Sequence, residues 1–180
     1  PAGIAYVEHS VWSCGLAGMK SQHTFEGQGS LTESRRKIFF PYYFYTARRI
    51  NEKTVLGMGV YTPFGVGTEW GRTWNGRYVS SYGTLSTLFY NPVISCKIND
   101  MITIGCGASY VTSAARIESM VDSGFHLYHY GFADSSKIAQ PAMDTVFSMK
   151  GRGSGASING GVLMRFGEKI RLGASFRTVT

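Results

Sequence analysis

Apolar and polar residues alternate along most of this chain, which is the pattern of β-strands with one apolar face. Between residues 102 and 110 the even positions are apolar, whereas the odd positions are Thr, Gly or Ser. The same alternation, again with apolar residues on even numbers, recurs at 56–60, 88–98, 158–166 and 170–177. Residues 38–45 keep this phase but are aromatic on both faces, and the first strand, about residues 7–25, alternates poorly. The pattern predicts an all-β chain of about seven antiparallel strands.

Three short connections share one format: a cation, an apolar residue, Asn or Gly, an acid, and then the next strand. They start at Arg49, Lys97 and Arg165. A three-residue loop in each place keeps every strand on the even phase, because facing residues of a hairpin lie on the same side of the sheet. The facing residues would be Ile50 and Thr54, Ile98 and Ile102, and Phe166 and Ile170. This register also sets Cys96 opposite Ile104 and Cys106 opposite Ile94, which argues against a disulfide between these cysteines.

Two long irregular stretches, about residues 63–82 and 122–144, separate these hairpins. Short turns at one end and long loops at the other are typical of a transmembrane β-barrel, whose apolar face points outward to lipid. A soluble sandwich or lipocalin-like barrel that binds a lipid-like ligand shows the same alternation, but its apolar face points inward. Alternation alone does not separate the two folds.

Composition narrows the class of protein. The 180 residues are 43% apolar and include 23 glycines, which excludes collagen-like and disordered chains. No apolar run reaches 18 residues, so a transmembrane helix is excluded. The net charge of +7 suits an anionic partner without selecting one. The three cysteines, including Cys14, have no CxxC spacing, and we expect mostly free thiols.

Signals of enzymatic chemistry are weak. His126 and His129 lack a third ligand or a nearby acid that would complete a zinc site. The Gly-x-Gly-x-Gly of residues 151–155 precedes a strand rather than a helix, which argues against nucleotide binding. The basic residues at 35–37 and 48–49 lack an RNA-binding motif, and strand-end cations that meet lipid phosphate explain them better. We expect no enzymatic activity and no cofactor, metal or nucleic-acid partner. A more distant alternative is an outer-membrane lipid-modifying enzyme, which needs a Ser/His pair in the lumen.

Longer motifs point to one family. Residues 57–70 are Gly-Met-Gly-Val-Tyr-Thr-Pro-Phe-Gly-Val-Gly-Thr-Glu-Trp, followed by Trp-Asn-Gly-Arg-Tyr at 74–78 and Leu-Phe-Tyr-Asn-Pro-Val-Ile at 88–94. Pro-Ala-Gly at the start, residues 25–27, and residues 151–155 and 159–162 add further matches. Their order and spacing resemble the outer-membrane long-chain fatty-acid and hydrocarbon transporter family (FadL/TodX). The resemblance covers most of the chain.

The resemblance implies a fourteen-stranded barrel of roughly twice this length, with an N-terminal plug in its lumen. Residues 1–8 would be the end of the plug and residues 9–180 about half of the barrel. Residues 176–180 lack the terminal aromatic residue of such barrels, so we expect the chain to end after an internal strand. The implied protein is a monomer in the outer membrane of a Gram-negative-type bacterium, where it contacts membrane lipid and lipopolysaccharide. Its implied activity is passive uptake of a hydrophobic small molecule, a long-chain fatty acid or an aromatic hydrocarbon.

In this family the ligand leaves sideways, through a gap made by an inward kink of the third strand. The positions that match the kink are Thr62, Pro63, Phe64 and Gly65. Pro63 has no N–H to donate and Gly65 permits unusual dihedral angles, so both tolerate an interrupted sheet. Pro1 and Ala2, as the last residues of the plug, are predicted to lie against this gate.

The ligand pocket is predicted from the resemblance and from the phase of the strands. A carboxylate in an apolar pocket needs a cation, and the best match to the family's headgroup-binding arginine is Arg116. Arg116 nevertheless carries the outward even phase, and Glu118 could simply pair with it. The aromatic residues on the inward odd phase, which either line the pocket or pack on the plug, are Phe39, Tyr43, Tyr45, Tyr61 and Phe89. Arg165, Arg171 and Arg177 share this phase and are interpreted as lumen charges paired with acids.

Overall fold

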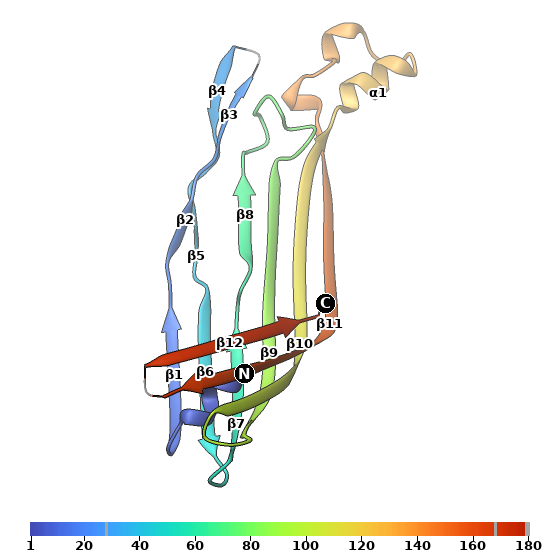
Figure 1. Cartoon of the computed structure of the whole chain (residues 1–180). Helices are drawn as coiled ribbons and strands as arrows, with labels where there is room; N and C mark the ends of the chain where they lie inside the picture. The colour runs from blue at the N-terminus through green and yellow to red at the C-terminus, as the bar shows by residue number, and fades with distance from the viewer. Residues whose placement is uncertain (28, 168, 179–180) are drawn as a thin grey trace.

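The computed structural model describes residues 1–27, 29–167 and 169–178, so Gln28, Glu168, Val179 and Thr180 lie outside the described residues. Over the described residues the chain is mostly antiparallel β-structure (Figure 1). A short 3-10 helix, η1 (Ala2–Tyr6), precedes the strands. The strands are β1 (Ser10–Leu16), β2 (Met19–Ser21), β3 (Thr24–Gly27), β4 (Ser30–Glu33), β5 (Lys37–Phe39), β6 (Tyr42–Arg49), β7 (Thr54–Tyr61), β8 (Gly65–Glu69), β9 (Tyr82–Lys97), β10 (Ile102–Val121), β11 (Thr145–Phe166) and β12 (Ile170–Arg177).

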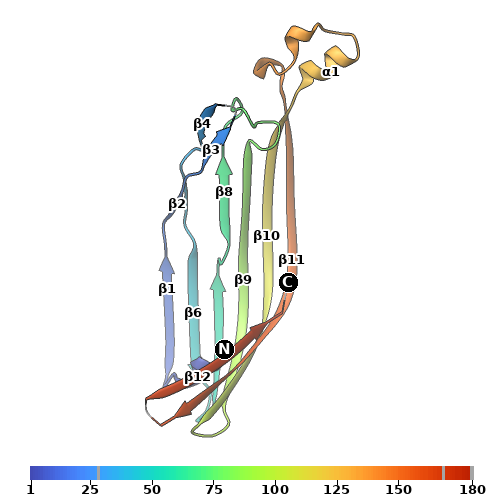
Figure 2. The ribbon, with the colours of Figure 1, turned by 45° about the horizontal axis from the view of Figure 1, so that its top comes forward.

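The main sheet is a meander in the order β1-β6-β7-β9-β10-β11-β12, and β8 pairs with β9 after a short break from β7. Two ribbons, β2–β5 and β3–β4, continue β1 and β6 toward the long loops (Figure 2). If β7 and β8 are counted as one interrupted strand, the main sheet of the described residues has seven strands, as the alternation predicted. In this part of the chain β1 pairs only with β6 and β12 only with β11, so the sheet is not closed.

The three short turns have the predicted register. The facing pairs are Ile50 and Thr54, Ile98 and Ile102, and Phe166 and Ile170. In the first turn the Asn51 side chain accepts hydrogen bonds from the amides of Lys53 and Thr54, and Asn99 has the same role in the second turn. The third turn uses Gly167, whose φ of 65° lies in the left-handed region that favours glycine. The local sequence therefore determines how these strands pair.

The even and odd positions lie on opposite faces of the sheet. On the odd face, Ser95 Oγ donates to the Ala2 carbonyl oxygen at 3.0 Å, so η1 covers this face. On the even face Ile94, Ile104 and Ile158 are 42–56% exposed. A soluble sandwich would bury the even face, whereas here η1 fills the odd one. The soluble alternative is therefore not supported, and the apolar face is the outer face.

The lower half of the sheet curls around η1. In Figure 1, β12 crosses in front of β1 and β6, and the N-terminus lies close behind it. The upper halves of β9, β10 and β11 run on to the long loops. β10 has 20 residues and β11 has 22, about twice the length that a tilted strand needs to cross a bilayer. The long strands thus place the concave lower half of the sheet at one end and the long loops at the other.

Some predicted boundaries differ from the structure. The first strand divides into β1, β2 and β3, and residues 38–45 divide at Phe40 and Pro41, because proline has no amide to donate to the sheet. The predicted loop 63–82 contains β8, so the irregular part is residues 70–81. Residues 122–144 form no strand and include α1 (Ser123–His129), η2 (Ser135–Lys137) and η3 (Pro141–Met143). Within the described ranges, no helix is long and apolar enough to span a bilayer.

Candidate functional site

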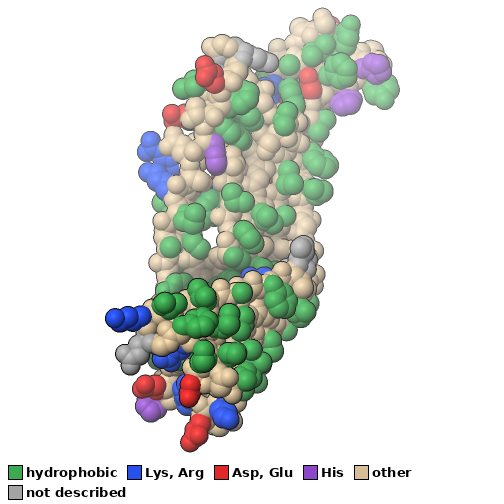
Figure 3. Space-filling view, viewed as in Figure 1, with side chains coloured by type: hydrophobic (Ala, Val, Ile, Leu, Met, Phe, Trp, Pro, Cys, Tyr) green, Lys and Arg blue, Asp and Glu red, His purple; other side chains and the backbone are tan. Residues whose placement is uncertain are grey.

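A cavity of about 600 Å³ lies on the concave side of the lower sheet. Pro1 and Ile4, at the start of η1 and within it, line the cavity; the strands β1, β6 and β7 form one wall, and β12 closes the opposite side. Among the described lining residues Arg177 is the only Lys or Arg side chain, and none is acidic. In Figure 3 hydrophobic side chains gather over β12, and the molecule is hollowed above it. A mostly apolar cavity with few polar groups suits a small hydrophobic ligand.

Four aromatic residues predicted on the inner face form one row, which we call the aromatic row: Tyr43, Tyr45, Tyr61 and Phe89. Successive ring centroids are 5.2, 5.7 and 5.4 Å apart. The register explains the row, because Tyr61 faces Tyr43 on one side and Phe89 on the other. Tyr45 lines the cavity, and Phe89 is buried. The row continues the cavity wall from β6 to β9.

Phe39 lies on the other face of the sheet, so the prediction that it points inward is wrong. A Cβ atom placed on Gly67 would lie 2.7 Å from Phe39 Cζ and 2.8 Å from Thr84 Cγ2. Phe39 therefore shares a face with Thr84, which has the outward even phase of β9. The cause is the break at Phe40 and Pro41 between β5 and β6, because a strict alternation does not carry across such a break.

The predicted gate is a β-bulge between β7 and β8. The register pairs that border it are Tyr61 with Phe89 and Gly65 with Ser86. Residues 62–64 therefore stand opposite only residues 87–88, which gives the bulge one extra residue. A bulge interrupts the hydrogen-bond ladder locally, and Pro63 at its centre cannot donate an amide hydrogen bond.

The edges of the bulge are nevertheless held. The Thr62 amide donates to a β6 carbonyl at 3.1 Å, and the Thr87 amide donates to the Phe64 carbonyl oxygen at 3.0 Å. The Phe64 side chain is 60% exposed. Gly65 is an ordinary strand residue whose φ lies outside the left-handed region, so the dihedral freedom predicted for it is not used. The interruption of the sheet thus rests on Pro63 and the extra residue.

Pro1 and Ala2 do not lie where the sequence placed them. A Cβ atom on Gly105 would lie 2.7 Å from the Pro1 carbonyl carbon and 2.6 Å from the Ala2 nitrogen. They therefore pack on β9 and β10 at Ser95 and Gly105. Phe89 faces Tyr61, the last residue of β7 before the bulge. Ser95 is six positions farther along β9, and six residues of strand span about 20 Å. The start of η1 therefore lies at a lower level of the wall than the bulge.

A single arginine anchors the end of η1. The Arg49 guanidinium donates to the carbonyl oxygens of Val7 at 2.8 Å, Glu8 at 3.1 Å and Ala5 at 3.3 Å. It also donates to the Glu52 carbonyl oxygen in the first short turn at 2.8 Å. Arg49 therefore ties the segment that covers the cavity to the sheet. Sequence analysis assigned Arg49 only to a turn, because its partners are carbonyl groups that no side-chain pattern reveals.

Arg177 reaches from β12 to the aromatic row. Its Nη2 donates to Tyr61 Oη at 2.8 Å, and its guanidinium carbon lies 5.5 Å from the ring centroid of Phe89. Among the described residues no carboxylate lies within 4 Å of Arg177, and the same holds for Arg165 and Arg171. The interpretation of these three as lumen charges paired with acids stays a prediction, and the described residues provide no such partner.

Arg116 does not enter the cavity. Its Nε donates to Glu118 Oε1 at 2.9 Å, and its guanidinium lies over the Tyr82 ring. The register of β10 with β11 is unbroken from residue 102 to 121, so no bulge turns Arg116 inward. The alternative pairing with Glu118 is what the structure contains, and the headgroup role of Arg116 stays a prediction.

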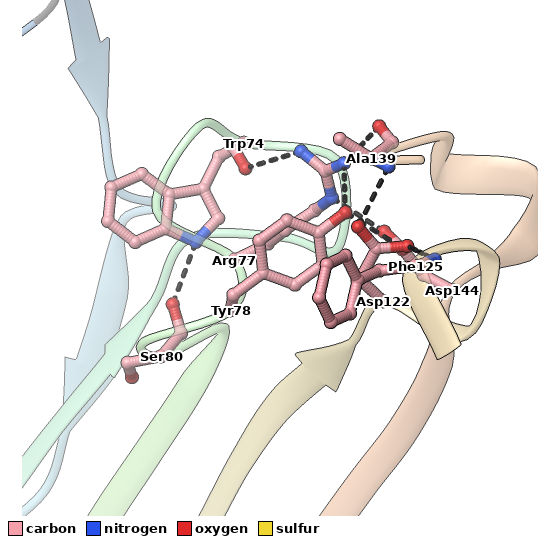
Figure 4. Close-up of polar contacts among 8 residues, drawn as sticks. All are labelled: Trp74, Arg77, Tyr78, Ser80, Asp122, Phe125, Ala139 and Asp144. Carbon is pink, nitrogen blue, oxygen red and sulfur yellow. Dashed lines mark hydrogen bonds and ion pairs between the residues drawn. The ribbon is translucent and has the colours of Figure 1, made fainter. Parts of the chain in front are cut away.

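A buried ion pair joins the two long loops (Figure 4). Arg77 Nε donates to Asp144 Oδ2 at 2.6 Å, and their side chains are only 8% and 0% exposed. Arg77 also donates to the Ala139 carbonyl oxygen at 2.7 Å, and Tyr78 Oη donates to Asp144 Oδ1 at 3.0 Å. Burial and the hydrogen bond to Asp144 raise the pKa of Tyr78. Sequence analysis missed this junction, because its members are distant in the chain and lie in loops without alternation.

Asp122 organises the second loop. Its carboxylate accepts hydrogen bonds from the amides of Phe125, at the start of α1, and Ala139, both at 2.8 Å (Figure 4). His126 and His129 lie on α1. Over the described ranges, no three His, Cys, Asp or Glu side chains are grouped as metal ligands.

Three aromatic rings cluster at the loop end of the sheet. Trp70 and Trp74 stack with centroids 4.6 Å apart, and Phe25 meets Trp74 edge-on at 5.6 Å. Trp74 Nε1 donates to the Ser80 carbonyl oxygen at 2.7 Å, which fixes its ring (Figure 4). The three aromatic rings thus lie together at the loop end of the sheet.

Comparison with protein-family models matches residues 1–180 to the family described as outer membrane protein transport protein (OMPP1/FadL/TodX). Comparison with curated protein sequences found no match.

Solved structures share the fold at low sequence identity. The chain resembles the Pseudomonas putida toluene transporter TodX with a TM-score of 0.76 and 15% identity, over 99% of this chain and 49% of that one. A TodX deltaS2S3 mutant, described as a monoaromatic hydrocarbon channel, gives 0.74 and 15%, over 97% and 48%. A Pseudomonas aeruginosa FadL homologue gives 0.69 and 16%, over 96% and 44%. The chain thus spans about half the length of each of these structures.

Proposed function

The chain belongs to the outer membrane protein transport protein family (OMPP1/FadL/TodX), and we propose that it serves passive uptake of hydrophobic ligands across the outer membrane. The observation that carries the proposal is the cavity of about 600 Å³ between η1, β7 and β12. It is lined mostly by apolar side chains, whereas the exposed even face suits contact with lipid. No step in this function requires covalent chemistry.

Arg177 and the aromatic row support a ligand with an acceptor headgroup. An unpaired anion in an apolar site is costly, so a carboxylate requires a cation or strong donors there. Arg177 provides both, and no described carboxylate competes for it. We therefore assign the headgroup role to Arg177 and favour a long-chain fatty acid over a neutral aromatic hydrocarbon. The apolar tail would lie along Ile4, Val93 and the rings of the row.

The bulge at residues 62–64 supports sideways release of the ligand. A lipid-like molecule that leaves through the wall stays out of the aqueous periplasm. The wall is interrupted at Pro63. The last paired residue before the interruption is Tyr61, which contacts Arg177. The headgroup site and the proposed exit are therefore adjacent. The cluster of Trp70, Trp74 and Phe25 at the outer end would capture apolar ligands first.

Deletion of Phe64 from the full-length protein tests this function. The deletion leaves two residues opposite residues 87–88, so that β7 and β8 become one continuous strand. Uptake of radiolabelled oleate is measured in cells that lack their own fatty-acid transporter, and binding of a fluorescent fatty acid is measured in detergent. We expect uptake to fall to the background of the empty strain while binding persists.

The matched control is Phe64→Ala, which keeps the extra residue and removes only an exposed side chain. We expect near-normal uptake from this variant. Normal uptake by the deletion variant would rule out the bulge as the exit. Absence of fatty-acid binding to the unmodified protein would refute the proposed ligand class.

A further inference from the structure

Three cationic side chains surround one phenol at the lower end of the inner face. Lys97 Nζ lies 5.0 Å from the Tyr6 ring centroid, and the guanidinium carbons of Arg165 and Arg171 lie 5.1 and 5.9 Å from it. The cations come from β9, β11 and β12, and Tyr6 comes from η1. Tyr6 Oη lies 3.2 Å from Thr103 Oγ1, which holds the ring in place. We call Lys97, Arg165 and Arg171 the basic triad.

The described residues bring like charges together in the basic triad and give it no acidic partner. Arg165 and Arg171 are directly opposite each other on β11 and β12, and like charges in this position destabilise an antiparallel pair. Among the described residues no carboxylate lies within 4 Å of any of the three cations. Burial raises the pKa of Tyr6, but the hydrogen bond to Thr103 and the charges of Arg165 and Lys97 lower it below its ordinary value. An anion at this place would relieve the repulsion.

We propose that the basic triad binds an oxyanion of the phosphate type. Two guanidinium groups offer paired N–H donors that match phosphate oxygens, and the ammonium group adds a third positive charge. Three cations suit a phosphate with up to two negative charges better than a single carboxylate. None of the triad lines the cavity, and Arg177 is not part of it. The site is therefore separate from the proposed hydrophobic ligand, and its occupant is either free phosphate or the phosphate of a lipid headgroup.

The test measures thermal unfolding of the full-length protein. In non-ionic detergent, millimolar inorganic phosphate is compared with sodium chloride of equal ionic strength. In nanodiscs, phosphatidylcholine alone is compared with phosphatidylcholine that contains phosphatidic acid. The variants are R165Q/R171Q and, as a milder second change, Lys97→Gln. The control is Lys150→Gln, which removes an exposed cation from the outer face of β11.

We expect phosphate, or phosphatidic acid, to raise the unfolding midpoint of the unmodified protein and of Lys150→Gln. The rise should vanish in R165Q/R171Q and shrink in Lys97→Gln. Without any phosphate, R165Q/R171Q should be at least as stable as the unmodified protein, because its like-charge pair is gone. A response in detergent identifies a soluble ligand, and a response in nanodiscs alone identifies a lipid headgroup; either supports the site. The proposal is overturned if neither phosphate shifts the unmodified protein, or if R165Q/R171Q responds equally.

Discussion

Arg177 on β12 donates a hydrogen bond to Tyr61 Oη on β7 at 2.8 Å, so the last strand of the chain contacts the third strand of the meander across the lumen. Arg177 is the only Lys or Arg among the described residues that line the cavity. Tyr61 is the last paired residue before the bulge. A ligand carboxylate that binds Arg177 would therefore lie next to Tyr61. The proposed headgroup site and the proposed exit thus lie on either side of one contact.

The first prediction concerns Arg177→Gln. The change removes the charge and keeps a side-chain donor, so it should weaken palmitate binding by about 1.5–3 kcal/mol, the usual contribution of a hydrogen bond to a charged group. Hexadecane, which has no headgroup, should bind as before. Competition with a fluorescent fatty acid in detergent measures both. Equal loss for palmitate and hexadecane would mean that Arg177 only shapes the cavity.

The second prediction concerns Arg49→Lys. Lysine keeps the charge but cannot reach the four carbonyl oxygens that the guanidinium bridges. Loss of two or more of these bonds should make local opening of η1 easier by about 2 kcal/mol or more. Hydrogen exchange of the amides of Ile4 and Val7, which bond within this segment, should accelerate accordingly. Unchanged exchange would show that packing on Ser95 and Gly105 is enough to hold η1.

The third prediction concerns Asp144→Asn in the loop junction. The change leaves Arg77 buried without its charge partner, and breaking a buried pair on one side costs about 3–5 kcal/mol. The cost should appear as local opening of residues 70–81 and 122–144, because the sheet below does not depend on the pair. Limited proteolysis should cut these loops at least tenfold faster while the barrel strands stay protected. Glu8→Gln, on an exposed acid at the opposite end, is the control and should leave the rate unchanged.

The fourth prediction concerns alkaline pH. The pKa of Tyr78 is raised above its ordinary value of 10.0 in the folded state, so its contribution to the junction is fully present below that pH. The contribution is lost as the pH rises through the folded pKa, because the phenolate repels Asp144 and no longer donates to it. Tryptophan fluorescence, which reports on Trp74 beside the junction, should therefore change above about pH 10. Tyr78→Phe should remove this transition, and its persistence would assign the change to another group.

Alternation and turn chemistry were enough to predict most of the sheet. Even positions such as Ile104 and odd positions such as Ser95 lie on the faces that the period of two requires, and the Asn51 and Asn99 turns fix the register between strands. The aromatic row follows from the same register. These features depend on neighbours in the sequence or on directly paired strands, and a sequence pattern contains that information.

The differences between prediction and structure have separate causes. Phe39 was misplaced because the break at Pro41 resets the phase, which a count of odd and even positions cannot detect. Arg116 was favoured by the resemblance although its own phase and Glu118 argued against it. The contact between Arg177 and Tyr61 became visible only with the curl of β12 toward β7, because it joins residues 116 positions apart. Lumen contacts of this kind depend on the curvature of the whole sheet.

The most direct test labels the two faces of the wall in the full-length protein, reconstituted in bilayers. Cys106, on the even face beside Ile104, serves as the outer reporter once Cys14 and Cys96 are changed to Ser. Tyr45→Cys, in a background without the native cysteines, reports on the cavity. We predict that Cys106 reacts only with a lipid-soluble maleimide, whereas the cysteine of Tyr45→Cys reacts only with a water-soluble one and is protected by oleate. Labelling of Cys106 from water, or no protection of the cavity site by oleate, would contradict the account.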